Sequence, residues 1–136
     1  FIAVRYCSGC IPFILLNLHR FFLYVTLIEL CVLWYDAIHG FFFPNGFGLG
    51  LGTVILALNA YLLSLYTFSC HSLRHWVGGN LDCFSQCPKR YKAWKLISAL
   101  NERHGLFMWI SLGWVGFSDL FVRLLSLGIW HDGRLF

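Results

Sequence analysis

Phe68-Ser-Cys-His-Ser-Leu-Arg-His-Trp-Val-Gly-Gly79 stands where a long apolar segment ends and the most basic part of the chain begins. The stretch brings a thiol, two imidazoles and a guanidinium close together in the sequence. If it is helical, His71 and His75 are four residues apart and share one face, with Cys70 next to His71. This grouping indicates a metal or redox site, and the alternative is a set of polar side chains that anchor a helix end at a membrane surface.

The composition predicts a membrane protein. The chain has 136 residues, of which 59% are apolar and 12% charged, and its mean hydropathy is +0.70. In a soluble domain roughly a quarter of the residues are charged. We therefore expect an all-α membrane protein with three transmembrane helices and a basic interfacial loop, forming part of a larger helical bundle.

Three apolar segments are long enough to cross a bilayer, since a helix rises about 1.5 Å per residue and the hydrocarbon core is ~30 Å thick. The expected organisation is an N-terminal segment (1–11), three spans (12–37, 48–70 and 105–129), a basic loop (71–104) and a tail (130–136). The loop holds six of the ten Lys and Arg residues. By the positive-inside rule it faces the cytoplasm, or the matrix of a mitochondrion.

Charged residues inside the spans indicate that the helices have neighbours, because such groups are costly in lipid. Glu29 and Asp36 are seven residues apart and lie on one face of the first span. Asp119 and Arg123 are four apart and can pair in the third. A fragment of a transporter would use these groups as a polar pathway, but it would not explain where the histidines gather.

Successive spans alternate in direction, so the basic edge collects the start of the first span, the end of the second and the start of the third. Four histidines and one cysteine then lie at one membrane edge, together with three arginines. These residues are His19, Arg20, Cys70, His71, Arg74, His75, Arg103 and His104. The clustering favours a redox or quinone site over simple anchoring.

Two histidine motifs carry a resemblance to a known family. Cys70-His-Ser-Leu-Arg-His-Trp-Val-Gly-Gly79 and Leu100-Asn-Glu-Arg-His104 together resemble the cytochrome-b-like membrane anchor subunit of succinate dehydrogenase, in the form found in actinobacteria. The resemblance runs from about residue 16 over nearly the whole chain. Members of the family are expected to carry more spans than the three found here, so either an N-terminal portion is absent or another polypeptide supplies those helices.

The resemblance implies a subunit of succinate:quinone oxidoreductase, respiratory complex II. Such a subunit fixes the flavoprotein and iron–sulfur subunits to the membrane and passes their electrons to a quinone. It also implies a Rieske-type 2Fe–2S cluster in place of the usual b haem, and such a centre takes two cysteines and two histidines. The matching metal-ligand candidates are Cys70, His71, His75 and His104, and haem b on the histidines is the alternative cofactor.

One thiol is too few for a Rieske centre, so a further thiolate or acidic ligand must come from elsewhere. Cys7, Cys10 and Asp36 are the candidates within the chain.

A quinone needs an aromatic cavity and a hydrogen-bond donor for each carbonyl. On the basic edge His19, Arg74, Trp76 and Trp109 are the quinone-binding candidates, and Asp36 and Asp119 are candidates for a proton relay or a second site on the far edge.

The resemblance implies that the membrane is the bacterial cytoplasmic membrane or the mitochondrial inner membrane. Succinate chemistry belongs to the partner subunits.

A second hypothesis is a non-redox accessory membrane subunit of a respiratory complex, whose basic loop binds anionic lipid. Bound metal would separate the two hypotheses, because an assembly subunit needs none. The sequence contains no catalytic triad and no phosphate-binding motif, and no nucleic-acid partner is expected.

Overall fold

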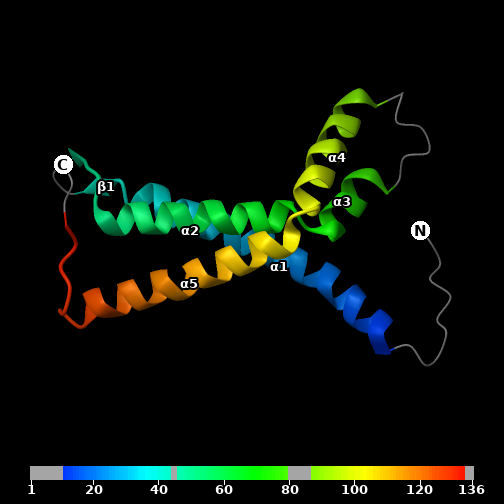
Figure 1. The fold of residues 1–136 in the computed structure, drawn as a ribbon. Helices are drawn as coiled ribbons and strands as arrows, with labels where there is room; N and C mark the ends of the chain where they lie inside the picture. Colours follow the sequence, from blue (N-terminus) through cyan, green and yellow to red (C-terminus); the bar gives the residue numbers. More distant parts are fainter. Residues whose placement is uncertain (1–10, 44–45, 80–86, 134–136) are drawn as a thin grey trace.

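The computed structural model of the chain describes residues 11–43, 46–79 and 87–133. This part of the chain forms five helices and one short antiparallel hairpin (Figure 1). The elements are α1 (Ile11–His39), β1 (Phe42–Phe43), β2 (Gly46–Phe47), α2 (Leu51–Phe68), α3 (His71–Gly78), α4 (Pro88–Asn101) and α5 (His104–Ser126). The hairpin pairs Phe42 with Phe47 and Phe43 with Gly46.

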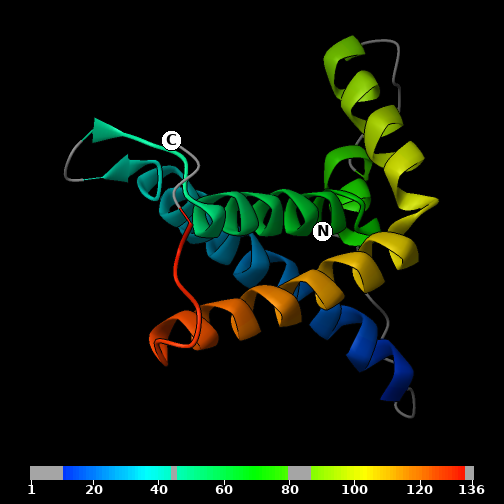
Figure 2. The ribbon, with the colours of Figure 1, turned by 60° about the vertical axis from the view of Figure 1, so that its left-hand side comes forward.

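Three helices are long and apolar enough to cross a membrane. The candidate spans are Leu18–His39, Leu51–Phe68 and His104–Ser126, and α2 packs against both α1 and α5 (Figures 1 and 2). The prediction of an all-α protein with three apolar spans is confirmed, and the two-residue strands β1 and β2 are the departure from it within the described residues. The segment 71–104, expected as a basic loop, contains α3 and α4.

The inward face of α2 is built from small and polar residues, which let helix backbones approach closely where no water competes. Ala60 is fully buried, and Ser64 is buried beside it. Trp34 Nε1 of α1 donates to Ser64 Oγ at 3.0 Å, and Trp114 Nε1 of α5 donates to the carbonyl oxygen of Ile55 at 3.2 Å. Each outer helix is therefore joined to α2 by an indole hydrogen bond as well as by packing.

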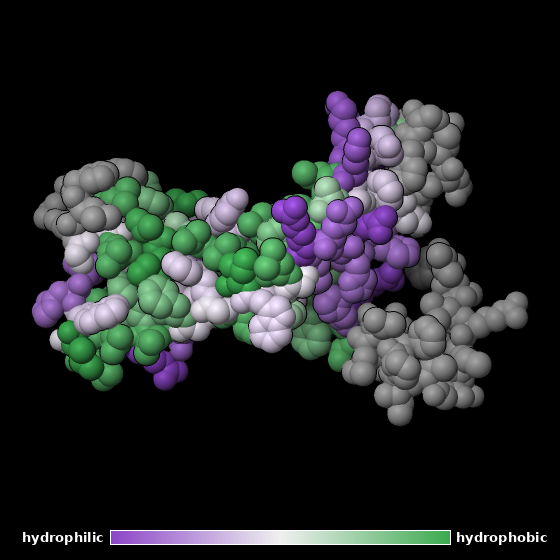
Figure 3. Space-filling model, in the orientation of Figure 1, coloured by the Kyte–Doolittle hydropathy of each residue, from purple (hydrophilic) through white to green (hydrophobic). Residues whose placement is uncertain are grey.

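The short helices α3 and α4 run across the bundle rather than along it, at the end where α1 and α5 begin (Figures 1 and 2). They pack on each other: Arg74 Nε donates to Ser98 Oγ at 2.8 Å, and the Arg90 guanidinium donates to the carbonyl oxygen of Val77. Hydrophilic residues gather over this end, whereas apolar residues cover the three long helices (Figure 3).

The tail after α5 turns back to the start of α2. Gly128 adopts a left-handed conformation (φ 72°), which favours glycine, and allows the chain to leave α5 sharply. The Asp132 carboxylate then accepts a hydrogen bond from the Gly52 N–H at 2.9 Å, and the Gly133 carbonyl accepts one from the Leu51 N–H at 3.1 Å. The end of α5 is thereby tied to the N-terminus of α2.

Candidate metal centre

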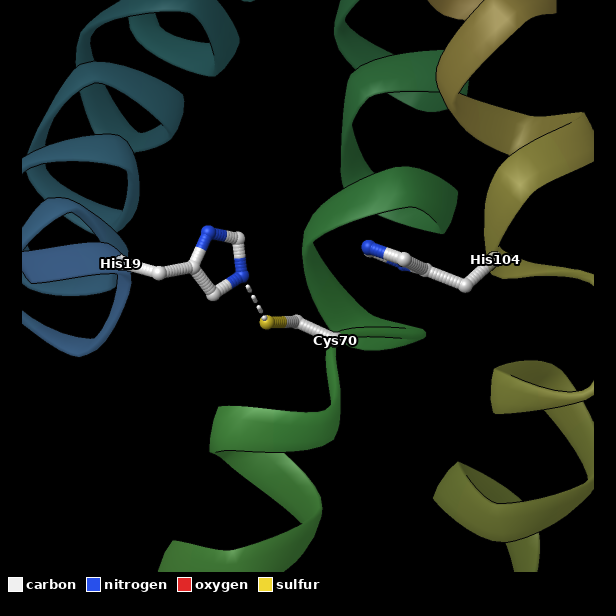
Figure 4. Close-up of side chains that lie close together, drawn as sticks. All are labelled: His19, Cys70 and His104. Atoms are coloured by element: carbon white, nitrogen blue, oxygen red, sulfur yellow. Dashed lines mark hydrogen bonds between the residues drawn. The ribbon is translucent and has the colours of Figure 1, made fainter. Parts of the chain in front are cut away.

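Three elements bring a thiol and two imidazoles together at the basic end. His19 comes from α1, Cys70 from the break between α2 and α3, and His104 from the first residue of α5 (Figure 4). Their ligand atoms all lie within 4.8 Å of one another, and His19 Nε2 is 3.2 Å from Cys70 Sγ. Because Cys70 is 4% exposed, this group, His19–Cys70–His104, is shielded from bulk solvent at the thiol.

The break between α2 and α3 places the thiol. Ser69 ends α2 with helical angles, and Cys70 then adopts an extended conformation (φ −65°, ψ 134°) and begins α3. The Cys70 carbonyl accepts a bond from the Arg74 N–H at 3.1 Å, as an N-cap residue does. The change of direction turns the Cys70 side chain toward His19 of α1 (Figure 4).

Ser69 and Tyr66 hold the imidazole of His104 in place. The Ser69 hydroxyl donates its proton to the Tyr66 carbonyl at 2.7 Å and also lies 2.8 Å from His104 Nδ1. In the tautomer that carries its proton on Nδ1, His104 donates to this hydroxyl and keeps the Nε2 lone pair, which is the form that can bind a metal. Tyr66 holds the imidazole from the side, with its ring centroid 5.0 Å away.

His71 forms an outer layer on this group. Its ring is stacked on His19, with centroids 4.9 Å apart and planes parallel to within 5°. Desolvation lowers the pKa of His71 below its ordinary value, and the nearby charges of His19 and Arg20 lower it further. The neutral form is favoured, which suits an imidazole stacked on another imidazole.

A cavity of about 250 Å³ opens beside the group, between α1 and α2. Its walls are mainly apolar, with the polar atoms of the group at one end. The residues that line it are His19, Phe22, Leu23, Thr26, Tyr66, Thr67 and Cys70.

A second cleft, of about 340 Å³, lies between α3 and α4. The Arg74 guanidinium is held there by its bond to Ser98 and by the Trp94 ring, whose centroid is 5.0 Å from the guanidinium carbon. Extra side-chain atoms at Gly78 would collide with Trp94, and at Gly79 with His75. The cleft is lined by His71, Arg74, His75, Gly78, Gly79 and Trp94.

The residues predicted from sequence are thus divided between several places. Among the predicted metal ligands, Cys70 and His104 meet in the group, whereas His71 and His75 line the second cleft. Cys7 and Cys10, two candidates for a further ligand, lie outside the described residues. The third candidate, Asp36, is exposed near the other end of α1.

The predicted quinone-binding residues are also dispersed. His19 belongs to the His19–Cys70–His104 group, and Arg74 lies in the second cleft. The side chains of Trp76 and Trp109 are 61% and 69% exposed. Asp119 pairs with Arg123 at 3.2 Å on an outer face of α5.

Neither His19, predicted for quinone binding, nor Ser69 is among the predicted metal ligands. For His19 the sequence carries a usable signal, because it places this residue at the same membrane edge as Cys70. No pattern in the sequence marked Ser69, because its importance arises only from the packing of α2 against α5.

Comparison with known proteins agrees with the histidine motifs. A family profile described as actinobacterial succinate dehydrogenase subunit SdhC matches residues 6–128. A chain in the solved structure of the Mycobacterium smegmatis Sdh1 complex in the apo form is 45% identical, with a TM-score of 0.86. The match covers 97% of this chain and 50% of that one, so this chain spans half the length of the solved chain it matches. None of the curated proteins matches.

Proposed function

The chain belongs to the family of actinobacterial succinate dehydrogenase subunit SdhC, and from this we propose that it anchors succinate dehydrogenase in the membrane and passes electrons from the iron–sulfur subunit to quinone. The observation that carries the electron-transfer role is the meeting of His19, Cys70 and His104 within 4.8 Å at the basic end. A purely mechanical anchor has no need for a thiol and two imidazoles at one point.

The donor set fits three of the four ligands of a Rieske-type 2Fe–2S centre. Such a centre takes two imidazoles on one iron and two thiolates on the other. His19 and His104 supply the imidazoles and Cys70 one thiolate, so a second thiolate is required from outside the described residues or from another chain. When bound, the cluster accepts and donates single electrons at a raised potential.

A b haem, the alternative cofactor, suits the arrangement less well. A haem on these histidines would need open space beside the nitrogen that holds it, and Cys70 Sγ lies only 3.2 Å from His19 Nε2. The compact group therefore favours a cluster.

The second cleft is the proposed place for the quinone headgroup. Arg74 can donate a hydrogen bond to a quinone carbonyl from its terminal nitrogens, because its Nε is already held by Ser98. Trp94 and His75 would enclose the ring, and His71 lies between this cleft and His19. The exposed indoles of Trp76 and Trp109 suit the route by which an apolar tail enters from lipid.

Further proposals concern the surroundings of the chain. The flavoprotein and iron–sulfur subunits dock at the basic end, which faces the cytoplasm or matrix, and succinate is oxidised by those subunits. Asp36 and Asp119 remain candidates for proton transfer at the far edge.

Metal content and low-temperature electron paramagnetic resonance of the reduced, purified complex test the proposal. The variants His19→Ala, His104→Ala and Cys70→Ser should each lose the cluster signal. His75→Ala should retain it, because His75 lies in the second cleft, and His39→Ala on the far side is a control for histidine loss. An optical b-type band in place of the cluster signal would identify the cofactor as haem. Full quinone reduction by the His19→Ala and His104→Ala complexes would leave only the anchoring role and favour the accessory-subunit hypothesis.

A further inference from the structure

Glu29 is a charged residue in the middle of a membrane-spanning helix. The span of α1 runs from Leu18 to His39, so Glu29 is about 15 Å from either end at roughly 1.5 Å per residue. This distance is too long for its short side chain to reach the headgroups. Nevertheless its side chain is exposed on the three-helix bundle, and no described cation lies within ion-pair distance of it.

The orientation of α1 shows which surface carries Glu29. Leu23, Leu30 and Ala37 are buried, and they mark the side of α1 that packs toward the other helices. With 3.6 residues per turn, Glu29 projects about a quarter of a turn away from that side. Phe22, Val25, Val32 and Asp36 project within about a sixth of a turn of Glu29 and form with it a stripe that we call the Glu29 face. The three apolar members are each at least half exposed.

An ionised carboxylate facing acyl chains is expensive, and acidic groups within spans are normally turned to a protein interior and paired. We propose that a further membrane helix, from outside this chain, covers the Glu29 face and places a basic side chain opposite Glu29. Charge complementarity identifies the partner as a cation-bearing helix. This chain covers 50% of the solved chain that it matches. A protein of that length therefore has further sequence that can supply such a helix.

The Glu29 face is continuous with the metal centre. Phe22 belongs to the face and also lines the 250 Å³ cavity beside His19 and Cys70. A helix lying along the face would therefore close the outer side of that cavity. This inference concerns assembly and does not depend on the proposed electron transfer.

Photo-crosslinking in the intact complex tests the covering helix without altering Glu29. A benzophenone amino acid is placed at Val25, on the Glu29 face, and in a matched variant at Tyr24, which is 48% exposed and projects to the opposite flank of α1. The expected product from Val25 is a peptide adduct whose other end maps to a membrane segment containing Lys or Arg. Adducts of Val25 with lipid alone, in the same yield as from Tyr24, would overturn the proposal.

Thermal unfolding of the same complex provides a second test. The midpoint of the Glu29→Leu variant shifts in opposite directions when a basic side chain faces Glu29 and when lipid does. If a basic partner faces Glu29, Glu29→Leu leaves that cation unpaired and lowers the midpoint by several degrees, while Glu29→Gln lowers it less. If lipid faces Glu29, Glu29→Leu removes a charge from hydrocarbon and raises the midpoint, which would refute the paired helix. Both readouts are independent of quinone reduction, so a failure of the proposed electron transfer would not affect them.

Discussion

Ser69 lies fully buried between α2 and His104, and its hydroxyl is bonded on both sides. It donates to the Tyr66 carbonyl and, when His104 carries its proton on Nδ1, accepts from that imidazole, so it orients the ring. Groups that hold the second nitrogen of a ligating histidine determine which nitrogen binds the metal and how firmly the ring is held. Asn101 Nδ2 also donates to the Ser69 carbonyl at 2.7 Å, which joins the end of α4 to the same point.

If the His19–Cys70–His104 group holds a metal as proposed, Ser69→Ala should weaken metal binding without removing a ligand. The expected loss of affinity is about 10- to 100-fold, the usual effect of removing an outer partner of a histidine ligand. Chelator competition on the purified complex measures it. Ser111→Ala is the matched control, because Ser111 is also buried and bonded to a backbone carbonyl but contacts no histidine through a hydrogen bond. Equal affinities in the two variants would contradict the orienting role.

At the scale of elements, α3 and α4 meet so closely that glycine is required. A methyl group at Gly78 would overlap the Trp94 indole, and Trp94 in turn supports the Arg74 guanidinium. Gly78 thus leaves room for Trp94 of α4 to support Arg74, which precedes Gly78 by one turn on the same helix α3.

Gly78→Ala should destabilise this pair of helices by about 1–3 kcal/mol, the usual cost of overpacking. Gly113→Ala on α5 is the control, because a methyl group there meets no described atom within 4 Å and alanine favours a helix by about 1 kcal/mol over glycine. Thermal unfolding of the purified complex should show a lower midpoint for the first variant and an unchanged or higher one for the second. A lower midpoint for both would instead indicate a general cost of alanine.

The elements were the part of the structure most accessible from sequence. Long uncharged runs predict the spans because the bilayer demands a minimum apolar length, and alternation of direction placed His19, Cys70 and His104 at one edge. Sequence gives the depth of a residue but not the direction in which its side chain points around the helix axis. The sequence therefore predicts His75 as a metal ligand and His19 as a quinone-binding residue, whereas the break at Ser69–Cys70 turns α3 aside and places His75 in the second cleft.

At the scale of the whole molecule, the tail holds the far end of the bundle together. Gly50, the N-cap of α2, offers no side chain to bond the first amides of the helix. Asp132 does so from beyond α5, and its negative charge also suits the positive end of the helix dipole. One carboxylate therefore both caps α2 and fixes the distance between α2 and α5.

Asp132→Ala should lower the stability of the complex by about 1 kcal/mol, the typical cost of losing an N-cap side chain. Asp132→Asn should recover most of it, since the amide oxygen still accepts the Gly52 N–H. His131→Ala, an exposed neighbour, is the control. The measurement is thermal unfolding, and a midpoint for Asp132→Ala equal to that of His131→Ala would show that the tail does not hold the two helices.

The crosswise course of α4 has a consequence for membranes of different thickness. Lys89, Lys92 and Lys95 are exposed on a helix that lies across the bundle axis (Figure 1), so headgroup attraction keeps this end at a constant level relative to one leaflet. Hydrophobic mismatch must then be accommodated by tilt, or at the end formed by the hairpin and the tail. The candidate metal centre, which lies beside α3 and α4, would then keep its depth as the bilayer thickens, and the proposed electron path from the membrane surface would keep its length.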